Sequence, residues 1–274
     1  MNELIPMPER HQNTLNQPSN SLTFSKVEYS CKKNRYALLI PVINEGERIQ
    51  NQLKLLRNAN FGVDIVICDG GSTDESLSDS FLKTTSVRMV LSKIGQGKLS
   101  SQLRIGYSWC LDQGYSGVIT MDGNGKDGID GIAHFIQMLD KGYDYVQGSR
   151  FIPGGKSVNT PNLRALAIKL IHAPLISFSA GFRFTDTTNG FRAYSKKLLE
   201  NEKLGIFRTV FNRYNLLFYI SSQAPKLGLS CIEVPVCRRY PENGVIPTKI
   251  DGFAGKAHLL YETINAVTGR YNLR

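Results

Sequence analysis

The sequence lacks a long uninterrupted apolar run. Its 274 residues contain no stretch of about 18 consecutive apolar residues, because Arg, Lys, His or Pro breaks each of the longer candidates. A membrane-spanning helix needs a segment of about that length. The sequence therefore predicts no spanning helix, and a chain that is either soluble or peripheral to a membrane.

Cysteine is scarce and shows no redox-motif spacing. The five cysteines are odd in number, include no C-x-x-C pair and mostly lie inside apolar runs: Cys31, Cys68, Cys110, Cys231 and Cys237. This pattern is typical of buried, reduced thiols, so we expect a cytoplasmic protein.

Acidic residues are fewer than basic ones. The chain has 33 Lys and Arg against 23 Asp and Glu, a net charge of +10. Such a charge favours an anionic partner, such as nucleotide phosphates, nucleic acid or an acidic membrane surface. Nucleic acid is the poorest of these, because the basic residues are spread along the chain without an aromatic-interleaved patch.

The N-terminal residues differ in composition from the rest. Residues 1–30 are rich in Asn, Gln, Ser and Pro and lack the apolar core of a signal peptide. The pattern changes at Tyr36. We predict a flexible arm over residues 1–35 and a single domain over residues 36–274.

From Tyr36 onward, β-rich runs alternate with segments of helical spacing. The predicted strands are 36–41, 63–69, 87–92, 117–122, 143–149 and 229–236, and the predicted helices are 46–58, 74–83, 98–112, 131–142, 163–184 (one or two helices), 210–224 and 252–267. Strands separated by helices indicate an α/β fold, with a mostly parallel central sheet and helices on both faces. Ligands of such sheets bind at the carboxyl ends of the strands.

The segment "TMDGNGKDGID" (120–130) follows a predicted strand. It begins like a calcium-binding EF-hand loop, but Lys126, Asp127 and Ala133 occupy positions that require a ligand, a glycine and a glutamate. A phosphate-binding loop at 92–100 fails similarly, because Leu99 replaces the required Ser or Thr. Asp122 and Asn124 remain, on a turn made tight by glycines. They predict either a divalent-cation site that bridges to phosphates or a simple turn before the next helix.

Two other strand ends carry polar residues. In "DGGSTDES" (69–76), Ser72 or Thr73 can cap a helix that begins near Asp74, whereas Asp69 can accept hydrogen bonds from a nucleotide base or ribose. In "IPVINEGE" (40–47), a strand-to-helix turn explains Pro41 but does not require Glu45, so we expect Glu45 to contact a ligand.

Six ordered segments resemble the family 2 glycosyltransferases of the GT-A fold. They are "IPVINEGERI", "VDIVICDGGSTDES", "GVITMDGNGKD", "YVQGSRF", "TDTTNGFRAYSKKLL" and "IEVPVCRRY", and they look most like the dolichyl or polyprenyl phosphate mannosyltransferase branch. The resemblance covers about Tyr36 to Lys256.

The resemblance implies roles for individual residues. The implied nucleotide-sugar-binding residues are Pro41, Asn44, Glu45, Asp69, Gly123, Lys126, Arg239 and Lys249, the implied catalytic residues are Asp122, Asp127, Arg150 and Arg192, and the implied ligands of Mg²⁺ or Mn²⁺ are Asp122 and Asn124. The chain departs from the family pattern in two places. Asn124 replaces an acid, and Lys126 stands at a third metal-ligand position, so we expect weaker metal binding, with Lys126 acting on a phosphate or Asp127 replacing the missing ligand.

The implied reaction moves a sugar from a GDP- or UDP-linked donor with inversion. Guanidinium groups pair well with the leaving diphosphate, and a hydroxyl acceptor would need a general base such as Asp127 or Asp186, whereas a polyprenyl phosphate acceptor needs none. The basic amphipathic stretch 163–184 either lies on an anionic membrane, at the inner face of the cell membrane, or packs against the sheet. Two alternatives stay open: transfer to a sugar hydroxyl in surface polysaccharide assembly, and a catalytically weak nucleotide-sugar binding protein.

Overall fold

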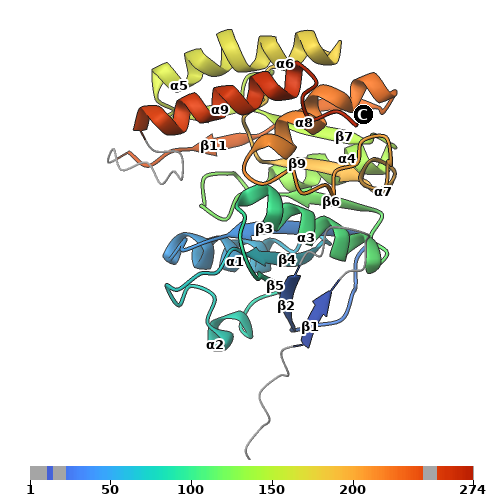
Figure 1. The fold of residues 1–274 in the computed structure, drawn as a ribbon. Coiled ribbons are helices and arrows are strands. Elements are labelled where there is room, and N and C mark those ends of the chain that lie inside the picture. The colour runs from blue at the N-terminus through green and yellow to red at the C-terminus, as the bar shows by residue number, and fades with distance from the viewer. Residues whose placement is uncertain (1–10, 15–22, 243–251, 274) are drawn as a thin grey trace, which may run out of the picture.

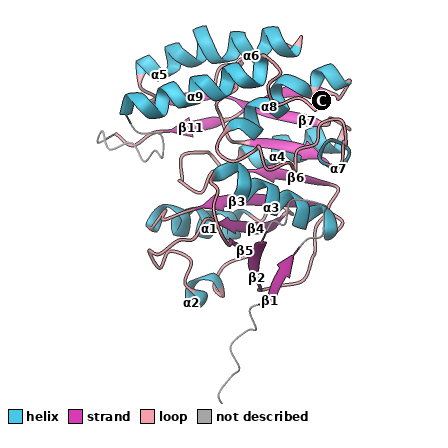
Figure 2. Ribbon diagram, in the orientation of Figure 1, coloured by secondary structure: helices cyan, strands magenta, loops and turns pink. Residues whose placement is uncertain are grey.

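The computed structural model describes residues 11–14, 23–242 and 252–273 (Figures 1 and 2). Its main sheet has nine strands in the order β1-β2-β5-β4-β3-β6-β9-β7-β10. Their bounds are β1 His11–Thr14, β2 Thr23–Glu28, β3 Tyr36–Val42, β4 Asp64–Asp69, β5 Val87–Lys93, β6 Gly117–Thr120, β7 Tyr145–Ser149, β9 Arg192–Ser195 and β10 Cys231–Pro235. A separate parallel pair consists of β8 (Lys156–Val158) and β11 (Cys237–Arg239).

Most strands of the main sheet run in one direction. β3 pairs in parallel with β4 and with β6, and β4 pairs in parallel with β5. β9 lies antiparallel between β6 and β7, so β7 and its parallel neighbour β10 point the same way as β3. The predicted α/β fold with a mostly parallel sheet is confirmed. β9 was not predicted, because it is only four residues long and follows a turn-rich segment.

The segment expected to be a flexible arm contributes a strand to this sheet. β2 pairs antiparallel with β5, and the Phe24 ring on β2 is completely buried. Removing an aromatic ring of this size from water stabilises the strand's position by about 2–3 kcal/mol. Residues 23–28 are therefore ordered by pairing with the edge of the sheet. The polar composition of the N-terminus did not indicate this.

Helices cover both faces of the sheet because successive strand residues point to opposite sides. On β3, Leu38 and Ile40 pack with α1 (Glu47–Ala59), α2 (Asp79–Leu82) and α4 (Gly131–Asp140). Ala37 and Leu39 pack on the opposite side with α3 (Leu99–Asp112), α6 (Ala173–Ala180) and α8 (Asn215–Gln223). Strands buried on both faces read as continuous apolar runs, as "YALLIP" does.

The remaining short helices are α7 (Lys196–Leu199) and the 3₁₀ turn η2 (Pro225–Leu227). The predicted helix 74–83 is wrong over its first half, since α2 begins only at Asp79. Glu75 has a φ of 56°, a left-handed conformation that no α-helix contains, and Asp74 accepts hydrogen bonds from Ser76 instead. The helix predicted over 210–224 likewise begins only at Asn215.

The helix predicted over 163–184 is one continuous helix that ends at Ala180, so residues 181–184 are not helical. It comprises α5 (Asn162–Ala167), the π-turn η1 (Ile168–His172) and α6, and it lies beside α9 (Gly252–Val267) at the edge of the molecule farthest from α2 (Figure 1). Among the described residues, one helix has the length and the apolar composition that crossing a membrane requires, and it spans Asn162–Ala180. Counting uninterrupted apolar residues missed it, because Arg164 and Lys169 break the run.

Candidate active site

The carboxyl ends of β3, β4 and β6 meet at one edge of the sheet, because these strands pair in parallel. Hydrogen bonds join the loops that follow β3 and β4. The Asn44 side chain accepts from the Thr73 backbone N–H at 2.7 Å, and the Asn44 backbone N–H donates to the Ser72 hydroxyl at 3.1 Å. Ser72 and Thr73 therefore brace this loop and do not cap a helix as expected.

Two acidic residues stand at this edge. Asp69 is 9% exposed and its Oδ1 accepts the backbone N–H groups of Gly71 and Ser72 at 3.1 and 2.8 Å. Glu45 is 8% exposed and accepts from Arg48 Nη2 at 2.9 Å. Both carboxylates are thus held in fixed positions next to the β3 and β4 ends, as a nucleotide-contacting role requires.

The loop after β6 is fixed against β3 and α1. A Cβ at Gly123 would lie 3.1 Å from the Pro41 carbonyl oxygen, so only glycine allows this approach without displacing the strand. Gln52 donates to the Asp122 carbonyl oxygen at 3.1 Å and accepts from the Gly125 N–H at 3.1 Å. Sequence reasoning missed Gln52, although it stands on the buried face of α1 among apolar residues, and a buried polar side chain there needs a partner.

Arg238 lies between two carboxylates at this edge. Its Nη2 is 2.8 Å from Asp122 Oδ2, and its Nη1 is 2.7 Å from both oxygens of Asp127. The Asp127 side chain is completely buried, Arg238 is 8% exposed and Asp122 is 25% exposed. Asp122 is therefore the member of this group that is most open to solvent.

The charges in this cluster shift one another's protonation. Burial acts to raise the pKa of Asp122, but Arg238 and then Lys126 outweigh it and hold this pKa below its usual value. Burial raises the pKa of Asp127, and Arg238 opposes that effect only in part. Burial, followed by the neighbouring Arg238, lowers the pKa of Lys126 to about 8.

Three cationic side chains surround the ring of Tyr240. Lys126 Nζ lies 5.2 Å, Arg164 Cζ 5.6 Å and Arg238 Cζ 6.0 Å from the ring centroid. Aromatic faces attract cations at such distances. Cations from the β6 loop, from α5 and from β11 therefore lie close to one another around this ring. The sequence indicated neither Tyr240 nor this position of Arg164.

Two arginines with implied catalytic roles are buried, and their side chains bind to other groups of the protein. Arg150 forms a two-point pair with Asp186, with Nε–Oδ2 at 2.6 Å and Nη2–Oδ1 at 2.8 Å, and both side chains are almost fully buried. Arg192 is 0% exposed and donates to the carbonyl oxygens of Asn189, Leu217 and Thr187. Arg192 is therefore buried and holds the 187–189 loop in place.

The arginine that reaches the site from the "CRRY" segment is Arg238. Arg239 is exposed, and only its backbone N–H contacts the β6 loop, at 2.8 Å from the Lys126 carbonyl oxygen. Lys249, the other implied cation of this segment, lies outside the described residues. Neighbouring strand residues point to opposite sides, so one of the two arginines had to face away.

The metal ligands implied for Asp122 and Asn124 fit a divalent ion only in part. Among residues 11–14, 23–242 and 252–273, no three His, Cys, Asp or Glu side chains gather as a ligand set. Arg238 already contacts Asp122 Oδ2, and the amide nitrogen of Asn124, not its oxygen, lies 3.4 Å from the same atom. Asp127 cannot replace the missing ligand while Arg238 holds both its oxygens. Two protein oxygens suffice for Mg²⁺ only if substrate phosphates supply more.

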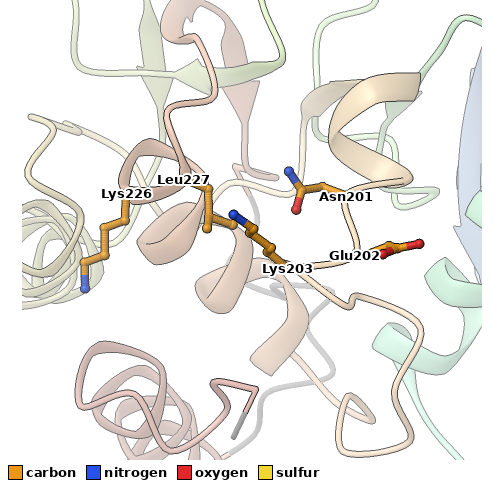
Figure 3. Close-up of a pocket in the computed structure, with 5 residues that line it drawn as sticks. All are labelled: Asn201, Glu202, Lys203, Lys226 and Leu227. Atoms are coloured by element: carbon orange, nitrogen blue, oxygen red, sulfur yellow. The ribbon is translucent and has the colours of Figure 1, made fainter.

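Two cavities open elsewhere on the surface. One of about 540 Å³ is lined by Asn201, Glu202, Lys203, Lys226 and Leu227 (Figure 3). A second, of about 370 Å³, lies between β5, α3 and the 209–212 loop and includes Lys93, Gly97 and Arg104. Neither contains any residue that the motifs singled out, so the strand-end cluster remains the candidate active site.

Known proteins of similar sequence or structure indicate the family of the chain. Two similar curated proteins are the polyprenol monophosphomannose synthase of Mycolicibacterium smegmatis (28% identical over 214 residues, 77% of this chain and 80% of that protein) and the undecaprenyl-phosphate mannosyltransferase of Micrococcus luteus (28% over 204 residues, 74% and 82%).

A similar solved structure is glucosyl-3-phosphoglycerate synthase from Mycobacterium tuberculosis with Mn²⁺, UDP-glucose and phosphoglyceric acid. It has a TM-score of 0.57 and 13% identity, and the match covers 86% of this chain and 79% of that one, which supports the GT-A fold. The model of glycosyl transferase family 2 matches residues 37–202. The chain therefore belongs to glycosyl transferase family 2 and is a glycosyltransferase.

Proposed function

We propose that this glycosyltransferase moves a sugar from a GDP- or UDP-linked donor to a polyprenyl phosphate, with inversion at the anomeric carbon. The names of the two curated relatives, which each match about three quarters of the chain, support a lipid phosphate as acceptor. The solved structure with UDP-glucose supports a nucleoside diphosphate sugar as donor.

One observation favours a phosphate over a hydroxyl acceptor. Asp127 and Asp186, the two motif carboxylates that could act as general base, are each completely buried and paired at both oxygens, with Arg238 and with Arg150. A base must reach the proton that it removes. A sugar hydroxyl would meet neither carboxylate, whereas a lipid phosphate is already ionised and attacks without a base.

The donor binds, in this proposal, across the ends of β3, β4 and β6. Asp69 and Glu45 contact the nucleoside, while Asn44 and Pro41 hold the loops that form its walls. Lys126 and Arg238 lie beside Asp122, where the diphosphate would be, and fixed cations stabilise the negative charge that grows on a leaving diphosphate. Arg239 and Lys249 are proposed to approach the same phosphates.

A divalent ion, Mg²⁺ or Mn²⁺, is proposed to arrive together with the donor. Asp122 and Asn124 would hold it, with the phosphates supplying the oxygens that the protein lacks, and Arg238 would leave Asp122 Oδ2 to make room. When bound, the ion supplies positive charge to the leaving diphosphate. Asp122 thus orients the donor, and Lys126 and Arg238 share its charge.

We further propose a cytoplasmic protein that is peripheral at the inner face of the cell membrane. All five cysteines are free, which is the state expected in a reducing compartment, although Cys31 is exposed and only Cys68 and Cys110 are fully buried.

The decisive experiment incubates the protein with radiolabelled GDP- and UDP-sugars and a polyprenyl phosphate, then extracts with organic solvent. We expect label from one donor in the organic phase, and a loss of at least about tenfold in Asp122→Asn, which removes the charge but keeps the shape. Label that enters only water-soluble saccharides would favour transfer to a hydroxyl. Nucleotide binding without any turnover would favour the weak binding protein.

A further inference from the structure

One side of the helix Asn162–Ala180 is apolar and uncovered. Leu163 is 70% exposed, Leu170 65% and Phe178 93%, with Leu166 and Ile171 also exposed between them. The opposite side packs inward through Ile168, His172, Ala173, Ile176 and Ala180. Residues three, four, seven and eight apart share one face of a helix, so the exposed residues form a single stripe.

The neighbouring helix α9 widens this stripe. Tyr261 and Ile264 on α9 are 53% and 43% exposed. The two helices are joined by a hydrogen bond between His172 Nδ1 and the Thr263 hydroxyl at 3.1 Å, and by one that the Ser179 hydroxyl donates to the Val267 carbonyl oxygen at 3.2 Å. Figure 1 shows them side by side at one end of the molecule. Together, Asn162–Ala180 and α9 form what we call the helical platform.

The charge on and beside the platform is positive. No Asp or Glu occurs between residues 162 and 185, and the one acid of α9, Glu262, is only 4% exposed. Lys169 and Arg183 are exposed next to the apolar stripe. Lys226 is exposed as well, and its Nζ donates to the Ser179 hydroxyl at 3.1 Å. An apolar face with a cationic border, and with no exposed acid on the described residues of either helix, complements an anionic lipid surface.

The platform begins beside the candidate active site. Arg164, in the first turns of α5, lies over the same Tyr240 ring that Lys126 and Arg238 approach. A molecule held in a bilayer under the platform would therefore present its phosphate close to Asp122 and Lys126.

We propose that the helical platform binds to the surface of an anionic lipid bilayer. The helix lies flat on that surface and does not cross it, because its inner face packs on the protein core and bonds to α9. Crossing a membrane would require all these contacts to break. The inference rests on the proposed function only for the identity of the acceptor, since a bilayer can be bound without any turnover.

Vesicle binding tests the platform directly. The full chain is mixed with vesicles of phosphatidylglycerol and phosphatidylcholine, or of phosphatidylcholine alone, and the bound fraction is measured by sedimentation. We expect binding to the anionic vesicles, a fall in partition coefficient of more than about tenfold in Leu170→Glu with Phe178→Glu, and a fall of about fivefold in Lys169→Gln.

The matched control is Leu55→Glu. Leu55 is 56% exposed, on α1 at a distance from the platform, and this change introduces one such acidic side chain without touching the stripe. All substituted side chains are exposed, so each variant should keep the thermal midpoint of the parent within a few degrees. Equal binding of parent and the double variant to anionic vesicles would overturn the proposal, as would equal losses in Leu55→Glu.

Three further measurements separate the alternatives. Extraction with alkaline carbonate should release the protein from vesicles, and retention would show a spanning helix instead. A parent dimer that becomes monomeric in the double variant, without any vesicle binding, would show that the stripe joins two copies of the chain. Transfer to a short, water-soluble prenyl phosphate should survive in the double variant, while transfer to a long-chain polyprenyl phosphate in vesicles should fall.

These activities keep the two proposals apart. Vesicle binding without any transfer would refute the proposed acceptor and leave the platform standing, and transfer without vesicle binding would do the reverse.

Discussion

Replacing Arg238 with methionine should destabilise the fold severely. The change removes the only cation that contacts Asp127 in the described hydrogen bonds, where Nη1 lies 2.7 Å from both oxygens of a carboxylate with no solvent exposure. Removing one partner of a buried pair costs about 3–5 kcal/mol, because the other charge stays buried and uncompensated. For a chain of 274 residues, that is a fall of about 5–9 °C in thermal midpoint.

The assay is thermal and urea unfolding of five proteins, which are the parent, Arg238→Met, Arg239→Met, Asp127→Asn and the double variant. Arg239→Met is the neighbouring control, since Arg239 is exposed, and it should change stability by less than about 0.5 kcal/mol. Asp127→Asn combined with Arg238→Met removes both charges of this pair, so it should recover about 1–3 kcal/mol relative to the sum of the single changes. If Arg238→Met destabilises no more than Arg239→Met, the buried pair does not hold this part of the fold.

Three other predictions concern the donor. The pKa of Lys126 is lowered to about 8, so this side chain loses its charge as the pH rises through 8. The KM for the donor should therefore rise above pH 8 in the parent but not in Lys126→Arg, because the arginine stays charged. Identical pH profiles of the two proteins would exclude Lys126 from phosphate binding. In Arg238→Gln, adding Mn²⁺ to the nucleotide-bound protein should raise the thermal midpoint by more than the same addition does in the parent, because Asp122 is then free of its guanidinium partner. An equal increment would contradict competition between Arg238 and the metal. Asp69→Ala should weaken nucleotide binding by about 10–100-fold in calorimetry, the usual effect of losing a hydrogen bond to a charged group, and an unchanged Kd would remove Asp69 from the nucleotide site.

The sequence predicts the sheet and the location of the site because both follow from short-range patterns. Apolar runs bounded by glycine and proline mark β3, β4 and β6, and the polar residues at their ends must meet once the strands are parallel. Asp69 and Asp122 therefore lie where the sequence indicates.

The partners of these residues could not be predicted, because they depend on distant pairing. Arg238 stands 116 residues after Asp122, and whether it or Arg239 faces the site depends on the register of β11 with β8. The same holds for Arg192, whose motif position says nothing about which way its strand turns the side chain. Its burial follows from β9, an antiparallel strand that local patterns did not reveal.

The pairing of Asp127 with Arg238 also orders the events of folding. During synthesis, β3 to β6 and Asp127 leave the ribosome before β11 does, and Asp127 precedes Arg238 by 111 residues. Contacts between such distant segments form late, because the long intervening loop must be closed first. An emerging chain can thus pair β3, β4 and β6 while the candidate active site is still incomplete, and the carboxylate of Asp127 gains its guanidinium partner only after β11 has been made.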